Sequence, residues 1–182
     1  MRDKTPALDA LTGAEKGELL DQLLATRPDL RKQAEAYAVQ RMSTEDRDAV
    51  ADDVESALSG LDIEELNGRV GYRSGAGYVH PSEAVDEILD EALQPFLDDL
   101  RRRAGLSITP AAVEIAVGIL CGLYRCRVGD SESLLEYSPD YAAERATDVV
   151  DQCEKLAIEL PLTDLLELAP DWETVFRRGT HA

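Results

Sequence analysis

Leucines and other apolar residues recur every three or four positions along most of the chain, which is the spacing of amphipathic α-helices. A first helix is predicted over residues 11–27, entered through a capping box formed by Thr12 and Glu15. Pro28 then fits the first turn of a second helix, which ends near Ser43. Because so few residues join them, the two helices are predicted to form an antiparallel αα-hairpin.

Three later segments show the same period, each with a continuous apolar face. A helix capped by Ser43 or Thr44 and ending near Gly60 is predicted to bury Ala49, Val50, Val54, Ala57 and Leu58. Residues 81–104 carry the most regular face, which comprises Val85, Ile88, Leu89, Ala92, Leu93, Phe96, Leu97 and Leu100. Residues 141–157 follow with Tyr141, Ala142, Ala146, Val149, Val150, Cys153, Leu156 and Ala157.

Residues 109–124 are apolar on nearly every side, which predicts a buried helix at the centre of the fold. Gly118 and Gly122 are four residues apart in this helix and therefore share one face. Because glycine has no side chain, we expect a neighbouring helix to approach closely there.

Short helices are predicted near residues 134–137, 163–168 and 171–178. No segment shows the alternation of a half-buried strand, so the fold class is all-α, with eight or nine helices packed as antiparallel hairpins. The spacing is compatible with a compact bundle and with a short α-solenoid. We treat residues 1–182 as a single helical domain, with possible sub-units at residues 11–66, 67–80 and 81–178.

The segment from Asn67 to His80 breaks this pattern, because four glycines fall among its aromatic and basic residues. It is predicted to be one long irregular segment, and either a binding loop or a packed connector. The candidate interaction residues offer aromatic surface or planar donors: Arg69, Tyr72, Arg73, Tyr78 and His80. For Tyr72 and Tyr78 packing against the hairpins is slightly favoured.

Charge limits the partners that the chain is expected to bind. Nineteen Lys and Arg against 37 Asp and Glu give a formal net charge of −18. Such a surface repels phosphate backbones and anionic lipid, so direct nucleic-acid binding and membrane binding are not expected. The charge is expected to serve solubility, which is the commoner role of an acidic surface, with a basic partner or DNA mimicry as the alternatives.

Hydropathy and cysteine content predict a cytoplasmic location. No apolar run approaches the ~20 residues of a membrane span, and the N-terminus lacks the pattern of a signal peptide. The three cysteines fall in predicted helices, which favours reduced core thiols over a disulfide framework.

Residues that could perform catalysis or hold a metal are better explained as structural, so no metal, no cofactor and no catalytic residue is predicted. Cys121 and Cys126 lie about 140° apart around a helix, which does not suit joint chelation of zinc. The acids Glu83, Asp86, Glu87, Asp90 and Glu91 are predicted to face water, opposite the apolar face of their helix. The leucine strings beginning at Leu20 and at Leu162 resemble docking helices and are interpreted as core.

A resemblance to one known family extends over roughly residues 11–160. The run RSGAGYVHPSEA at residues 73–84, followed by two long helices and then LLEYSPDYAAERATDVVDQC, resembles a helical, TPR-like region associated with bacterial SWIM-type zinc-finger proteins. Gly77, Tyr78, Ser82, Glu83 and Ala84 occupy comparable places. The Cys-x-Cys and Cys-x-His ligands of a SWIM finger are absent from the sequence, so the resemblance implies a helical scaffold without the zinc function.

Three hypotheses of function follow. The first is a non-catalytic module that binds another protein or a second copy of this chain, because paired helices without convergent polar residues usually present surfaces. The second is an acidic regulator that occupies a basic, nucleic-acid-binding surface of another protein. The third is an enzyme whose site lies near residues 67–80, with His80 as its general base.

Overall fold

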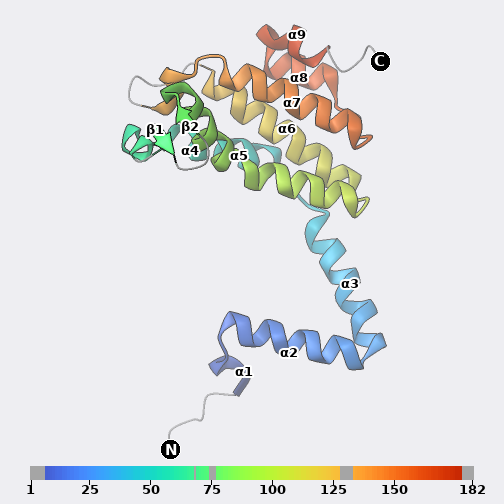
Figure 1. Cartoon of the computed structure of the whole chain (residues 1–182). Coiled ribbons are helices and arrows are strands. Elements are labelled where there is room, and N and C mark those ends of the chain that lie inside the picture. Colours follow the sequence, from blue (N-terminus) through green and yellow to red (C-terminus); the bar gives the residue numbers. More distant parts are fainter. Residues whose placement is uncertain (1–6, 68, 74–76, 128–132, 178–182) are drawn as a thin grey trace, which may run out of the picture. The chain divides into compact units, whose positions relative to one another are not determined.

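The computed structural model describes residues 7–67, 69–73, 77–127 and 133–177, without the side chains of residues 72, 73 and 77. Its contacts divide the chain into two units, residues 1–42 and residues 43–182 (Figure 1). The division falls inside the stretch 11–66 that the sequence suggested as one sub-unit. We describe each unit by itself.

The first unit contains three helices, α1 (Ala7–Ala10), α2 (Gly13–Thr26) and α3 (Pro28–Met42). The predicted capping box opens α2: the amide of Glu15 donates to Thr12 Oγ1 at 3.3 Å, and the amide of Thr12 donates to Glu15 Oε2 at 2.8 Å. Helices α2 and α3 pack against each other, which confirms the predicted αα-hairpin. None of the three helices contains a buried residue.

The second unit holds the remaining elements described here, in chain order α4 (Arg47–Ser59), the 3₁₀ helix η1 (Ile63–Leu66), strands β1 (Gly71–Arg73) and β2 (Gly77–Val79), α5 (Pro81–Gly105), α6 (Thr109–Cys126), η2 (Leu134–Tyr137), α7 (Tyr141–Lys155), α8 (Leu162–Leu168), η3 (Pro170–Trp172) and α9 (Glu173–Phe176). Across the described residues these elements make an all-α protein with a single short ribbon of strand. The predicted fold class is therefore confirmed.

Helix α6 is the centre of the second unit, as its composition predicted. It packs against α4, α5, α7 and α8, and eleven of its eighteen residues are buried (Figure 1). By length and composition α6 could cross a membrane, the one helix of the described residues that passes this test. The sequence interpretation had found no such run. Because most of α6 is buried inside the protein, it is compatible with the core helix of a soluble protein.

The closest helix contact brings α4 onto the glycine face of α6. A Cβ atom built on Gly118 would lie 2.6 Å from Val50 Cβ and 2.8 Å from the carbonyl oxygen of Arg47. A Cβ atom on Gly122 would lie 2.7 Å from Val54 Cβ and 2.8 Å from a backbone carbonyl of α4. The expected close approach at these two glycines is confirmed.

The register of α4 differs from the prediction by a small rotation. The helix is capped by Asp46, whose Oδ1 accepts from the amide of Asp48 at 3.0 Å, and not by Ser43 or Thr44. Ala51 is buried together with Val50, Val54 and Leu58, whereas Ala49 is exposed. The side of α4 that meets the glycines of α6 decides which alanine is buried, and the sequence of α4 does not contain that information.

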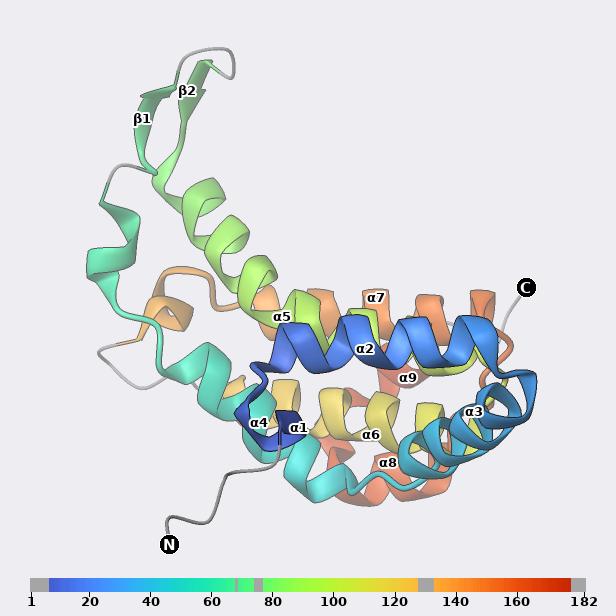
Figure 2. The ribbon, with the colours of Figure 1, turned by 90° about the horizontal axis from the view of Figure 1, so that it is seen from below.

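The segment 67–80 was predicted to be irregular throughout. In the structure it contains an antiparallel ribbon (Figure 2). Its pairs are Gly71 with Val79, Tyr72 with Tyr78, and Arg73 with Gly77. Gly71 has a φ of +103°, which favours glycine there. The strands are three residues long, too short for their alternation to stand out in a sequence.

Replacing either glycine of α6 tests the contact with α4. Gly118→Ala and Gly122→Ala each push a methyl group into α4 and are expected to lower the free energy of unfolding by about 1–3 kcal/mol, because the backbone of α4 must move. Gly105→Ala at the end of α5 is the control, since its Cβ would meet nothing within 4 Å. Urea unfolding measures all three. Equal stability of the Gly118 and Gly105 variants would contradict the close contact.

Candidate functional site

Arg69 and His80, two of the residues predicted for interaction, bond to residues of α5. Arg69 donates from Nη1 to Glu91 Oε1 at 2.7 Å and from Nη2 to Glu91 Oε2 at 2.8 Å, which fastens the segment before β1 to α5. The hydrogen bonds to Glu91 raise the pKa of Arg69. His80 is the N-cap of α5: its Nδ1 accepts from the amide of Ser82 at 3.4 Å and lies 2.9 Å from Ser82 Oγ.

Tyr78 is 57% exposed, so it is not part of the buried core. The next residue, Val79, is buried. This alternation is that of a ribbon with one face on the protein and one face in solvent. Tyr72 and Arg73 belong to β1, but their side chains lie outside the described residues, and so does His181, the other histidine of the chain.

The acids of α5 were predicted to face water, but two of them are only partly exposed and bond to other elements. Asp86 Oδ1 accepts from Ser138 Oγ at 2.6 Å, and Asp90 Oδ1 accepts from the Tyr141 hydroxyl at 3.0 Å. Arg145 Nε also lies 2.7 Å from Asp90 Oδ1. These acids therefore join α5 to η2 and α7.

The three cysteines are free thiols, and two of them are buried, as predicted. Burial raises the pKa of Cys126 to about 11 and that of Cys153 to about 12. Cys153 lines an apolar cavity of about 220 Å³ together with Val150, Ile158 and Phe176. A thiol with such a pKa is almost wholly protonated at neutral pH, so neither residue is suited to act as a nucleophile.

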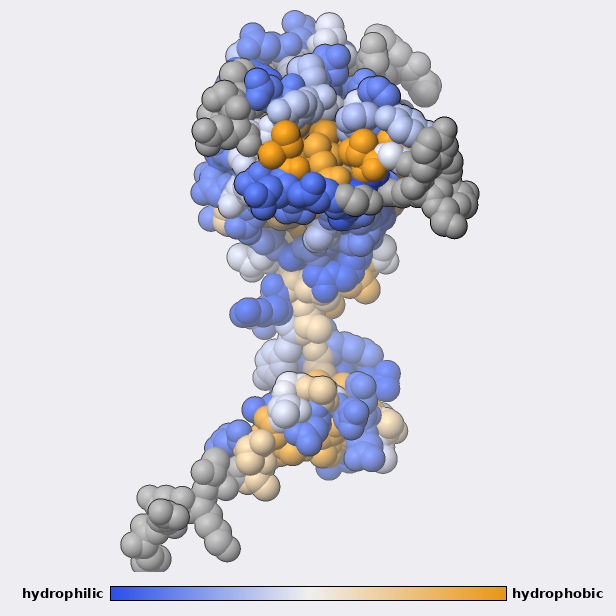
Figure 3. Space-filling view, turned by 60° about the vertical axis from the view of Figure 1, so that its left-hand side comes forward, coloured by the Kyte–Doolittle hydropathy of each residue, from blue (hydrophilic) through white to orange (hydrophobic). Residues whose placement is uncertain are grey.

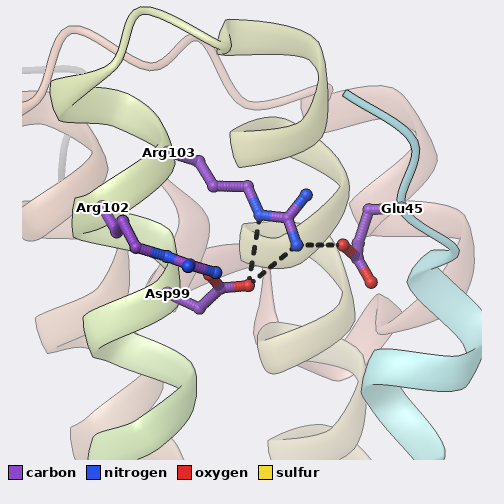
Figure 4. Close-up of polar contacts among 4 residues, drawn as sticks. All are labelled: Glu45, Asp99, Arg102 and Arg103. Atoms are coloured by element: carbon purple, nitrogen blue, oxygen red, sulfur yellow. Dashed lines mark hydrogen bonds and ion pairs between the residues drawn. The ribbon is translucent and has the colours of Figure 1, made fainter. Parts of the chain in front are cut away.

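The most buried charge of the described residues is Arg103 near the end of α5, whose side chain is 9% exposed (Figure 4). It donates from Nε and Nη2 to Asp99 Oδ2 at 3.2 and 3.0 Å and forms an ion pair with Glu45, just before α4. Arg102 donates from Nε to the other oxygen of Asp99 at 3.0 Å. Burial raises the pKa of Asp99, but the hydrogen bonds from both arginines outweigh it and the net pKa is lowered. This cluster is a joint that holds the start of α4 against α5.

Nowhere in the described ranges do three or more His, Cys, Asp or Glu side chains gather as they would around a metal ion. Several of the polar groups described above join α5 to other elements, and others pair within α5.

The leucines of the first unit are the feature that the sequence interpretation placed wrongly. Leu20, Leu23 and Leu24 of α2 were interpreted as core, yet Leu20 and Leu23 are 51% and 45% exposed and Leu24 is only partly buried. Leu8 of α1 and Tyr37 of α3 are 60% and 62% exposed. The C-terminal string meets the prediction, since Leu165 is buried and Leu162 and Leu166 are partly buried. The difference is that α8 packs on a core, whereas a hairpin of two helices has little core of its own.

Charge is divided unequally between the two units. Residues 1–42 contain seven Lys and Arg and seven Asp and Glu, so their net charge is zero, and residues 43–182 carry the whole −18. The surface of the second unit is correspondingly hydrophilic over most of the face in Figure 3, apart from one cluster of hydrophobic side chains. The first unit is thus the one on which apolar association is least opposed by charge.

Comparison with known proteins gives no match: no protein-family model, no curated protein and no solved structure is similar to this chain at a significant level. The resemblance to the helical region of SWIM-type zinc-finger proteins therefore stays a prediction.

Removing Arg103 tests the buried cluster. Arg103→Met leaves Asp99 and Glu45 without their shared cation and is expected to lower the free energy of unfolding by about 2–4 kcal/mol at pH 7. Arg101→Met is the control, because Arg101 pairs at the surface with Asp98 and should change stability by less than about 1 kcal/mol.

The same variant predicts a pH dependence with a definite sign. The pKa of Asp99 is lower in the folded state than its ordinary 3.8, so its pairing stabilises the fold above that pH and is lost as the pH falls through the lower, folded value. The stability difference between wild type and Arg103→Met should therefore shrink below about pH 4. Urea unfolding from pH 7 to pH 3 measures it, and a difference that is constant with pH would contradict the role of Asp99.

Proposed function

We propose that this chain is a non-catalytic protein-interaction module of the cytoplasm, and that its binding element is the α2–α3 hairpin. One observation carries the proposal: the hairpin exposes Leu20, Leu23 and Tyr37 and contains no buried residue. Isolated helices of 14 and 15 residues are marginally stable in water, so a partner that covers these side chains would stabilise the hairpin as it binds. The cytoplasmic location is supported by three free cysteines.

The second unit is suited to be a stable domain that carries the α2–α3 hairpin. Its helices share one core, and the polar groups described above are used in joints between helices. An amphipathic helix that lays its apolar face into a groove of another protein is a common mode of recognition.

A photo-crosslinking experiment tests the proposal. A photoreactive residue replaces the exposed Gln22 of α2, and the full chain is irradiated in the cells that make it. We expect a crosslinked protein partner in wild type and at least about tenfold less in Leu20→Glu/Leu23→Glu, because a buried charge without a partner costs several kcal/mol. Leu106→Glu is the matched control, since Leu106 of the second unit is also 51% exposed. Absence of any crosslink to protein would contradict the proposal.

The acidic second unit supports a second candidate, a regulator that occupies a basic surface of another protein. Residues 43–182 carry the whole net charge of −18, because the charges of residues 1–42 sum to zero. Protamine serves as the basic probe. Its affinity for the full chain should fall at least about tenfold between 0.05 and 0.5 M NaCl, because salt screens charge pairing. The affinity for protamine should be the same for wild type and for Leu20→Glu/Leu23→Glu. An affinity that does not change with salt concentration would exclude charge pairing as the basis of binding.

A further inference from the structure

We propose that the partner of the α2–α3 hairpin is a second copy of this chain, and that two hairpins pair about a two-fold axis into a four-helix bundle. The inference rests on the proposed function and names its partner. It is carried by the charges of the two helices, by their lengths and by the position of the exposed apolar side chains.

The charges of α2 and α3 have opposite sign. Helix α2 contains three acids and one lysine, a net charge of −2, whereas residues 27–42 contain four basic and two acidic residues, a net charge of +2. In a two-fold pair that lays α2 of one copy on α3 of the other, the attraction occurs twice. A hairpin whose two helices carried net charges of the same sign would repel a second copy. The opposite charges of α2 and α3 avoid this repulsion.

The lengths of the helices fit the same pairing. Helix α2 has 14 residues and α3 has 15, which correspond to about 21 and 22 Å at 1.5 Å per residue. Each helix can therefore lie along the whole of the opposite helix of the second copy. Four helices of nearly equal length with short connections are the usual elements of an antiparallel bundle.

The apolar side chains supply what such a bundle buries. Leu19 and Leu24 of α2, and Leu30 and Ala34 of α3, are already partly buried. Leu20 and Leu23 belong to the same apolar stripe of α2 as Leu19 and Leu24 but are about half exposed. Pairing of two copies would double the number of leucines around one axis and give the 42-residue unit the core that it lacks.

The second unit makes other pairings between copies less favourable. With a net charge of −18, two copies of it repel each other, whereas the first unit has a net charge of zero. Charge thus favours association of two chains through their first units.

Sedimentation equilibrium of the full chain tests the pairing. We expect a mass of twice 19.9 kDa at micromolar concentration. Leu20→Glu/Leu23→Glu should raise the dissociation constant at least about thirtyfold, and the matched control Leu106→Glu should leave it unchanged. A monomer at all concentrations up to about 100 μM would overturn the inference.

A charge exchange tests the orientation and leaves the apolar face intact. Glu18→Lys/Asp21→Lys changes α2 from −2 to +2, and Lys32→Glu/Arg41→Glu changes residues 27–42 from +2 to −2. All four positions are exposed, and Arg31, which donates to the carbonyl oxygen of Leu24 at the hairpin corner, is kept. Each double variant alone should dimerise at least about tenfold more weakly than wild type, and an equimolar mixture of the two should regain the dimer, because both helix contacts are then attractive.

The outcomes separate this inference from the proposed function. A mixture that stays monomeric, or variants that dimerise as wild type does, would overturn the α2-to-α3 pairing. A monomeric chain whose photoreactive Gln22 variant crosslinks to a different protein would overturn self-association and leave the proposed function standing. A monomeric chain whose photoreactive residue reacts only within its own chain would overturn both.

Discussion

The approach of α4 to the glycine face of α6 is the contact on which the second unit depends. At Gly118 and Gly122 the two helix backbones are so close that no side chain fits between them, and Val50 and Val54 fill the space directly. With α4 fixed in this way, α6 can bury most of its remaining faces against α5, α7 and α8. Glycine in a helix costs about 1 kcal/mol relative to alanine, which the dispersion contacts of a dry, close-packed interface offset.

Polar contacts between helices depend on this apolar core and fix the positions of the helices relative to one another. Apolar packing alone leaves helices able to slide, whereas Arg103, with Asp99 and Glu45, permits one position of α4 along α5. Asp86 and Asp90 do the same between α5 and the elements that follow α6. Such groups are costly to bury and contribute specificity more than net stability.

The sequence predicted the elements of the fold well and their environment less well. The capping box of Thr12, the central helix with its two glycines and the all-α class depend on local periodicity and local hydrogen bonds, which a sequence contains directly. Burial depends on what a helix meets in space, so Leu20 and Leu165 look alike in sequence although one is exposed and the other fully buried. The ribbon formed by residues 71–73 and 77–79 was not predicted, because its strands are only three residues long and each contains a glycine. The capping role of His80 could have been found, since it stands directly before Pro81 at a helix start.

The contrast between Leu20 and Leu165 also bears on the proposed docking role of the first unit. Leu165 belongs to a helix of seven residues, too short to be stable alone, and it is ordered by the core that buries it. Helix α2 is twice as long and has a complete capping box, which gives two amides at its start a hydrogen-bond partner, so it needs less help to form. A helix that is closer to stable by itself pays less entropy when it binds, and more of the free energy from covering its leucines is left for association. Helix α2, which is long and well capped but has no core of its own, is therefore suited to the proposed docking role. Helix α8, which is short and lacks a side-chain cap, is suited to completing the fold of the second unit.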